Sequence, residues 1–253
     1  MFQLFNPLEQ FQLVPFITLR SGTFDFSLTN STFFIIWSLV IFILFVHLCT
    51  FQGGGTVVPN RWQIILENLY SLVLGVVLDN LDSKGLRYFP FVFSLFIFVL
   101  CLNMIGMIPY SFTATRHLII TFALSLIVFV GRTYICFREH GFKFFAMFLP
   151  PGAPVILLPL LVPIEFISYF ITLIALAVRL FANMISGHIL LKVLIGFAWT
   201  MITAGRALLF FAHVLPLVVV FILIGIELAV SFIQAYVFAT LTCIYINTSL
   251  ELH

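Results

Sequence analysis

The sequence predicts an all-α polytopic membrane protein that forms one integral membrane domain over residues 1–253. Hydrophobic residues make up 63% of the chain and charged residues 8%, against about 45–50% and about 25% in an average soluble domain. The 11 Lys and Arg and 9 Asp and Glu residues cannot cover the surface of a soluble 28.7 kDa protein. Long continuous apolar runs, rather than short alternating segments, argue against a transmembrane β-barrel. The composition also excludes a disordered chain and a nucleic-acid binder with a basic surface.

The N-terminal part of the chain predicts three elements. Residues 1–32 are mixed in polarity and contain two prolines, so we interpret them as a surface segment with at most one short helix. Residues 33–51 carry no Asp, Glu, Lys or Arg and are long enough to span a bilayer core of about 30 Å. Residues 59–80 intersperse charged and apolar side chains, which favours an amphipathic helix on the membrane surface. A poor spanning helix is the alternative for this segment.

A hairpin of two spanning helices is predicted over residues 89–137. Its apolar runs cover residues 89–109 and 117–137, and a short polar loop separates them. We interpret the segment from Gly131 onward as a polar connector, because it contains Arg132 and further charged residues.

The distribution of Lys and Arg predicts the orientation of these helices. The regions 52–90 and 131–150 hold six of these residues and should lie on one side, whereas the N-terminal segment and the hairpin loop hold two. Basic residues accumulate on the inner side of a membrane. The N-terminus is therefore expected on the outer side.

The last hundred residues predict two long, strongly tilted helices that form a hairpin over residues 154–248. The proline-free stretches 164–200 and 217–247 would extend about 55 Å and about 46 Å as single helices. Both lengths exceed the hydrocarbon core, so the helices must tilt, bend or break. Four shorter spanning pieces are the alternative.

Each of the two long helices carries one polar stripe on a helical wheel. The stripe of the first is only about 60° wide, and His188 lies about 140° away from it. A charged side chain at the bilayer centre costs at least about 2.5–3.5 kcal/mol, and such residues mark ion pathways. Internal salt bridges that pin the helices together are the alternative. The first stripe comprises Glu165, Ser168, Thr172, Arg179, Asn183 and Ser186, and the second comprises His213, Glu227, Ser231, Gln234 and Tyr245.

Side-chain chemistry assigns roles to these residues. Glu165, His188 and Glu227 can gain and lose protons and therefore suit a proton relay. Arg179 stays protonated under biological conditions, so it is a fixed positive charge that blocks proton passage. The remaining candidates can only form hydrogen bonds, so they would hold water or orient their neighbours: Asn183, Gln234, Ser168 and Ser231.

Three motifs resemble subunit a of F-type ATP synthases. The run ALAVRLFANMISGHIL at 175–190 resembles the signature around the arginine of that family, and IELAVSFIQAYVFATL at 226–241 resembles its final helix. The run LVPIEFISYF at 161–170 is similar to the segment before the arginine, where the family has an acidic residue. The resemblance covers about residues 60 to 247 and is weakest over residues 1–32.

The resemblance implies a function and a location. Arg179 would face the rotor ring of c subunits, with Asn183 one turn further on, and Glu227 and Gln234 would form the polar pair of the last helix. The arrangement of His188 and Glu227 is similar to the mitochondrial form, which implies the mitochondrial inner membrane. Protons would enter from the intermembrane side and leave to the matrix through two offset half-channels.

The resemblance also implies the partners of the chain. It would be a non-catalytic stator subunit that contacts the c-subunit ring, the peripheral stalk, other small membrane subunits and the lipid bilayer. The sequence contains no nucleotide motif and no paired ligand spacing for a metal. We therefore expect no cofactor, no metal, no nucleotide and no nucleic acid on this chain.

Two other functions remain open from the sequence alone. A self-contained secondary transporter of protons or cations would also bury charges, but it should show internal repeats, and the two halves of this sequence show no convincing repeat. A respiratory-chain subunit without cofactors would co-purify with redox partners rather than with a c-ring.

Overall fold

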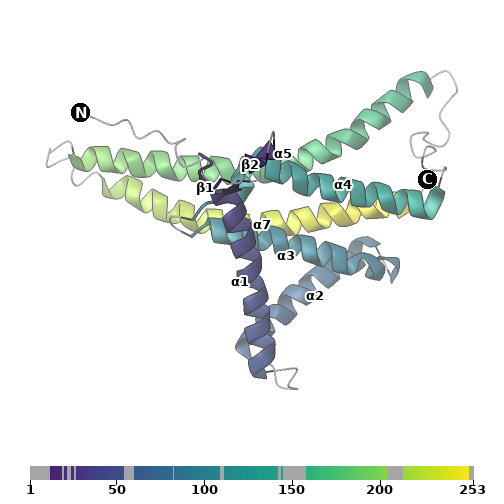
Figure 1. The fold of residues 1–253 in the computed structure, drawn as a ribbon, viewed down its shortest axis with the longest axis horizontal. Coiled ribbons are helices and arrows are strands. Elements are labelled where there is room, and N and C mark those ends of the chain that lie inside the picture. The colour runs from purple at the N-terminus through teal and green to yellow at the C-terminus, as the bar shows by residue number, and fades with distance from the viewer. Residues whose placement is uncertain are drawn as a thin grey trace.

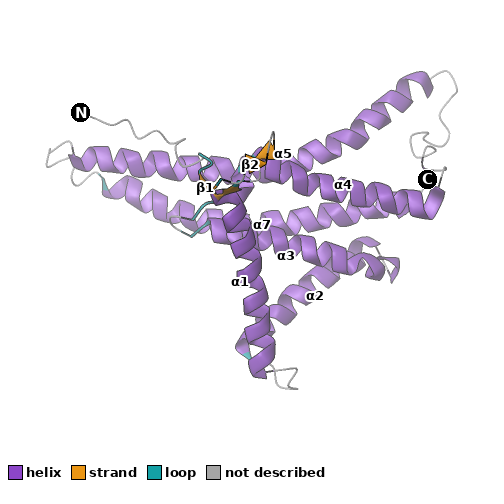
Figure 2. Ribbon diagram, viewed as in Figure 1, coloured by secondary structure: helices purple, strands orange, loops and turns teal. Residues whose placement is uncertain are grey.

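The protein is nearly all helical, as the sequence predicts (Figure 2). Among the described residues, six helices are long and apolar enough to cross a membrane. This confirms the expected class of all-α polytopic membrane protein. The computed structural model describes residues 12–18, 20–21, 24–25, 27–53, 60–81, 83–108, 111–141, 144, 158–203 and 213–250.

Among the described residues, four short strands precede the first helix. β1 (Pro15–Ile17) pairs with β4 (Leu28–Thr29), and β2 (Arg20–Ser21) pairs with β3 (Phe24–Asp25), both antiparallel. The described residues before Asn30 therefore contain these strands and no helix, and residues 1–11 lie outside the described part.

Asparagine side chains lie at the start of the first two helices. α1 (Asn30–Gly53) begins where Asn30 Oδ1 accepts the amide of Ser31 at 2.9 Å. α2 (Arg61–Leu81) begins after Asn60, whose Oδ1 accepts the amide of Arg61 at 2.7 Å and whose backbone oxygen accepts the amide of Ile64 at 3.0 Å. By length and composition α2 is also able to cross a membrane, so its position on the membrane surface stays a prediction.

The predicted hairpin consists of α3 (Phe89–Gly106) and α4 (Leu118–His140), which follow the short 3₁₀ helices η2 (Ser83–Tyr88) and η3 (Ala114–Arg116). The interpretation of a connector from Gly131 onward is wrong, because α4 continues for nine more residues.

Helical periodicity explains why α4 continues. Arg132 lies on its buried face, whereas Arg138 and Glu139 lie on its exposed face. The helix ends at Gly141, whose φ of 55° is accessible to glycine at little cost.

Two long helices complete the fold. α5 (Leu158–Thr203) has 46 residues and α7 (Val214–Leu250) has 37, which correspond to about 69 Å and about 56 Å. Each is one continuous helix in the structure rather than two shorter pieces. α5 begins six residues before the proline-free stretch and accommodates Pro163 in its interior. The two helices lie next to each other along the left half of Figure 1.

The core forms where α7 packs on α3, with α2 and α4 beside them (Figure 1). Small residues on α7 allow close approach of the helices, as in other membrane bundles. By contrast, Ile119 and Phe221 are 82% and 79% exposed, as expected for side chains that face lipid. Fully buried residues of α3 and α7 in this core include Val92, Phe96, Val99, Ala235 and Cys243.

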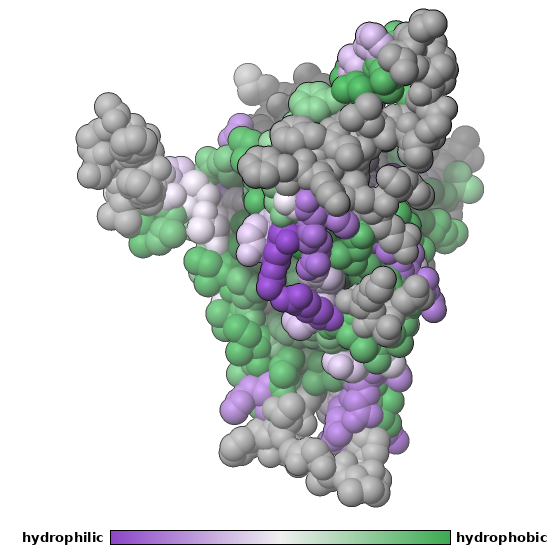
Figure 3. Space-filling view, turned by 90° about the vertical axis from the view of Figure 1, so that its right-hand side faces the viewer, coloured by the Kyte–Doolittle hydropathy of each residue, from purple (hydrophilic) through white to green (hydrophobic). Residues whose placement is uncertain are grey.

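Hydrophilic side chains gather on one end of the molecule, where α4 ends (Figure 3). Arg87 of η2 and Glu139 of α4 lie 4.0 Å apart there, and Arg138 is exposed. This end belongs to the side for which the sequence predicts the excess of basic residues.

Candidate functional site

A small cavity lies where α5 and α7 meet beside the end of α3. Its volume of about 10 Å³ is enough for about one water molecule. It brings together four of the residues selected from the sequence, although His188 lies on a different face of α5 from the polar stripe. The cavity is lined by Met107, Asn183, Met184, His188, Glu227, Val230 and Ser231.

Glu227 reaches this cavity because α5 has a glycine opposite it. A Cβ atom added at Gly187 would collide with Oε1 of Glu227 and lie 2.9 Å from its Cδ atom. Oε2 of Glu227 is buried, and within the described ranges no hydrogen-bond partner is found for it. The carboxyl group can therefore bind water or a proton donor from the cavity.

Asn103 is a polar residue of this region that the sequence reasoning missed. It is fully buried in α3, and its Nδ2 donates to the backbone oxygen of Ser231 at 3.4 Å. In the part of the chain that the structure describes, Asn103 Oδ1 and Ser231 Oγ have no partner. The sequence does indicate this residue, because Asn103 is an amide side chain within the apolar run 89–109. Such residues join membrane helices through hydrogen bonds.

The loop after α3 holds the imidazole ring of His188. Thr113 is fully buried, and its Oγ1 lies 3.2 Å from His188 Nε2 and 3.0 Å from the carbonyl oxygen of Gly106. The carbonyls at the end of a helix have no partner within the helix, and Thr113 supplies one for Gly106.

The polar stripe of α5 divides between two environments. Thr172 and Asn183 are half-buried, whereas the other members are exposed on the outer surface of the isolated chain. Most of the exposed members lie along one edge of the stripe. Thr172 and Asn183 line cavities that residues of α7 also line, so this part of the stripe approaches α7. Of the stripe residues, only Asn183 therefore lines the cavity around Glu227. The exposed members are Glu165, Ser168, Arg179 and Ser186.

Gln234 lies two turns after Glu227 on α7 and is half-buried. It follows Glu227 by seven residues, so the two side chains share one face of the helix. It does not line the cavity around Glu227.

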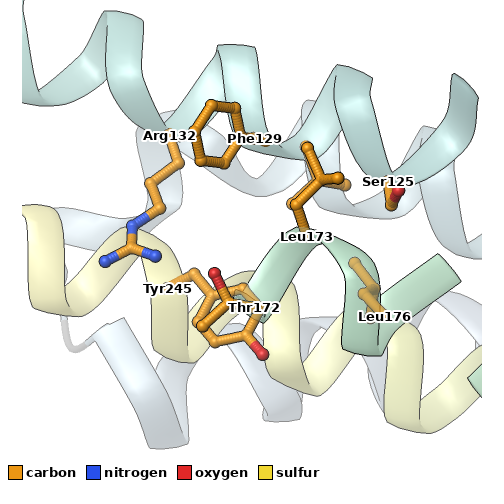
Figure 4. A pocket seen from close by; sticks show the side chains of 8 residues that line it. Ser125, Phe129, Arg132, Thr172, Leu173, Leu176 and Tyr245 are labelled. Carbon is orange, nitrogen blue, oxygen red and sulfur yellow. The ribbon is translucent and has the colours of Figure 1, made fainter. Parts of the chain in front are cut away.

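A second cavity of about 10 Å³ lies between α4, α5 and α7 (Figure 4). Arg132 extends from α4 into it and is only 6% exposed. Its guanidinium lies 4.3 Å from the ring centre of Tyr169 and 5.4 Å from that of Tyr245, and its Nε donates to Ser249 Oγ at 3.2 Å. Arg132 thus joins three helices at a position that the sequence reasoning assigned to a connector.

Substitution of Arg132 by alanine is expected to destabilise the junction of α4, α5 and α7. A desolvated cation–π contact contributes about 2 kcal/mol or more, which corresponds to a decrease of about 4–8 °C in Tm for a domain of this size. The measurement is the Tm of the purified chain in detergent. Arg138→Ala is the matched control, because it removes an exposed arginine from the same helix. Equal Tm values for the two variants would contradict the expectation.

The η3 loop adds a buried cation beside the first cavity. Arg116 is 5% exposed, its Nε donates to the backbone oxygen of Thr113 at 3.3 Å, and its guanidinium lies 5.2 Å from the ring centre of Phe112. Burial lowers the pKa of Arg116 to about 10, so this side chain remains a cation at pH 7. Burial, and then the charge of Arg116, lower the pKa of His117, which therefore favours the neutral form.

The fold and these sites define a multi-pass helical membrane protein with ionisable groups buried between its helices. Residues 32–247 match the family described as ATP synthase A chain. The chain therefore belongs to this family, whose members are non-catalytic subunits of the membrane sector of F-type ATP synthases. The resemblance found in the sequence is confirmed.

Several relatives named ATP synthase subunit a match this chain along nearly their whole length. ATP synthase subunit a of Chondrus crispus is 48% identical over 252 residues, which cover 100% of this chain and 98% of the relative. The subunit a of Pylaiella littoralis is 48% identical over 251 residues, covering 99% and 100%. The subunit a of the bacterium Parvibaculum lavamentivorans is 44% identical over 246 residues, covering 97% and 94%.

Proposed function

We propose that this chain is the proton-conducting stator subunit of an F-type ATP synthase. It provides two offset half-channels to and from a rotating c-ring, and Arg179 is the electrostatic barrier between them. Its site is the mitochondrial inner membrane, with the N-terminus on the intermembrane side. The peripheral stalk and other small membrane subunits hold it in place.

The position of Glu227 is the observation that carries this proposal. Its carboxyl group shares a cavity with Asn183 and His188 inside the chain, whereas Arg179, one turn before Asn183, is exposed outside it. Two titratable groups next to a cavity that fits water can transfer a proton stepwise.

The exposure of Arg179 supports a partner with acidic groups. A guanidinium that faces lipid at membrane depth costs several kcal/mol, so a carboxylate on a neighbouring subunit is its natural counter-charge. Each carboxylate of a rotating ring would lose its proton as it meets Arg179 and regain one from the side of Glu227. The exposed Glu165 and Ser168, further along the same face of α5, suit the other half-channel.

The energy scale of this mechanism is adequate. One elementary charge that crosses 100 mV releases about 2.3 kcal/mol. This energy is available to the ring only when protons cannot bypass it. A positive charge that never deprotonates prevents such a leak between the half-channels.

Reconstitution of the purified chain tests the proposal against a secondary transporter. In liposomes under an imposed pH gradient and membrane potential, the chain alone should give the proton flux of empty liposomes. Liposomes that contain the chain together with its c-ring should conduct protons. Proton or cation transport by the chain alone would favour the secondary transporter instead, and co-purification with redox partners rather than a c-ring would favour a respiratory-chain subunit.

A further inference from the structure

Thr113 lies at the centre of a hydrogen-bond arrangement that links the end of α3 to the imidazole ring of His188. Its hydroxyl has one hydrogen and lies within hydrogen-bond distance of two groups, the carbonyl oxygen of Gly106 at 3.0 Å and Nε2 of His188 at 3.2 Å. A carbonyl oxygen can only accept. When Thr113 donates to Gly106, the ring nitrogen of His188 must therefore be the donor in the second bond.

The surroundings hold Thr113 in this position. Its backbone oxygen accepts the Nε and the backbone amide of Arg116, both at 3.3 Å. Gly106 has no side chain that would separate the two groups, since a Cβ atom there would overlap the side chain of Thr113. Phe112, next to Thr113, stacks on His117 at 5.2 Å between ring centres. These contacts fix the position of the buried hydroxyl group of Thr113.

We infer that Thr113 is a positioning residue that keeps the hydrogen of neutral His188 on Nε2, so that Nδ1 is the nitrogen that exchanges protons. This inference rests on the proposed function. When a hydronium ion in the uptake half-channel gives up its proton, an Nδ1–H bond forms and a water molecule remains. The same bond breaks when the proton passes to the carboxylate of Glu227, directly or through water. The Nε2–H bond is unchanged throughout.

A fixed tautomer matters because a neutral ring that carries its hydrogen on Nδ1 cannot accept a proton at that nitrogen. A neutral imidazole has one donor and one acceptor nitrogen, and the hydrogen bond at one nitrogen determines the state of the other. Without Thr113 the ring is able to rotate and to exchange tautomers, and part of the population presents an N–H group where the lone pair is needed.

Substitution of Thr113 in the complete ATP synthase tests the inference. Thr113→Val keeps the shape of the side chain and removes the hydroxyl, and Thr113→Ser restores it. We expect Thr113→Val to reduce ATP-driven proton transport per assembled complex by roughly tenfold, the lower end for groups that orient functional histidines at metal sites. Thr113→Ser should keep near wild-type transport.

Thr115→Val is the matched control. Thr115 is as buried as Thr113 in the same loop, and among the described residues its Oγ1 has no hydrogen-bond partner. We expect this variant to transport protons as the wild type does. If Thr115→Val lowers transport as much as Thr113→Val, the effect is one of loop packing and the inference fails.

Three further outcomes would overturn the inference. These are normal transport in Thr113→Val, equal impairment in Thr113→Ser, and loss of assembly in both Thr113→Val and Thr113→Ala, which would make the hydroxyl purely structural. Arg179→Ala, measured in parallel, separates this inference from the proposed function. If Arg179→Ala abolishes coupling while Thr113→Val is normal, only the role of Thr113 is refuted.

Discussion

Arg179→Ala should abolish proton transport coupled to ATP synthesis while the complex still assembles. The side chain is exposed on α5, so its removal leaves no cavity in the core of the chain and the helix packing should persist. Under the proposed function, the variant loses the fixed positive charge that separates the two half-channels. Protons would then cross without turning the ring, and the ring carboxylates would lose their counter-charge. ATP synthesis and ATP-driven acidification of membrane vesicles measure the loss.

Lys192→Gln is the matched control for this experiment. Lys192 is a second cation on α5, more than three turns further on, half-buried and absent from the cavity around Glu227. Its substitution should leave coupling near the wild-type value. Arg179→Lys keeps a charge but loses the planar guanidinium, so it should retain less coupling than the wild type. Normal ATP synthesis in Arg179→Ala would refute the proposed role of Arg179 as the electrostatic barrier.

The spanning helices were predictable because an uncharged apolar run of about 20 residues matches the thickness of a bilayer core. The bounds of α5 were less predictable, because Pro163 in the sequence indicates the start of a helix rather than its interior. A proline inside a helix costs a hydrogen bond and favours a kink, but it does not prevent a helix whose packing compensates for the loss. Charged residues likewise did not end α4, since a helix that emerges from a membrane keeps its backbone hydrogen bonds.

The candidate site was predictable in its residue types and only partly in its geometry. The helical wheel placed His188 away from the stripe of Asn183, yet both line one cavity. The reason is that α5 has neighbours on two sides, and one of them is the loop that contains Thr113. The burial of Arg132 depends on Tyr169 and Tyr245, which are distant in sequence. The pattern of polar and apolar residues around Arg132 carries no information on contacts with residues this far away in the sequence.

Glu227→Gln should lower proton transport through the assembled complex by at least about tenfold. A general acid–base group typically contributes about 10²- to 10⁴-fold to a proton-transfer step. Under the proposed function Glu227 carries a proton from His188 to the ring, and glutamine cannot do so. The amide has nearly the same shape as the carboxyl group, so contact with Gly187 and the packing of α5 on α7 should survive, and the complex should assemble. ATP-driven acidification of vesicles, normalised to assembled complex, is the measurement. Glu227→Asp keeps a titratable group on a shorter side chain and should retain more transport. Equal transport in Glu227→Gln and the wild type would show that protons reach the ring by a route that avoids this cavity.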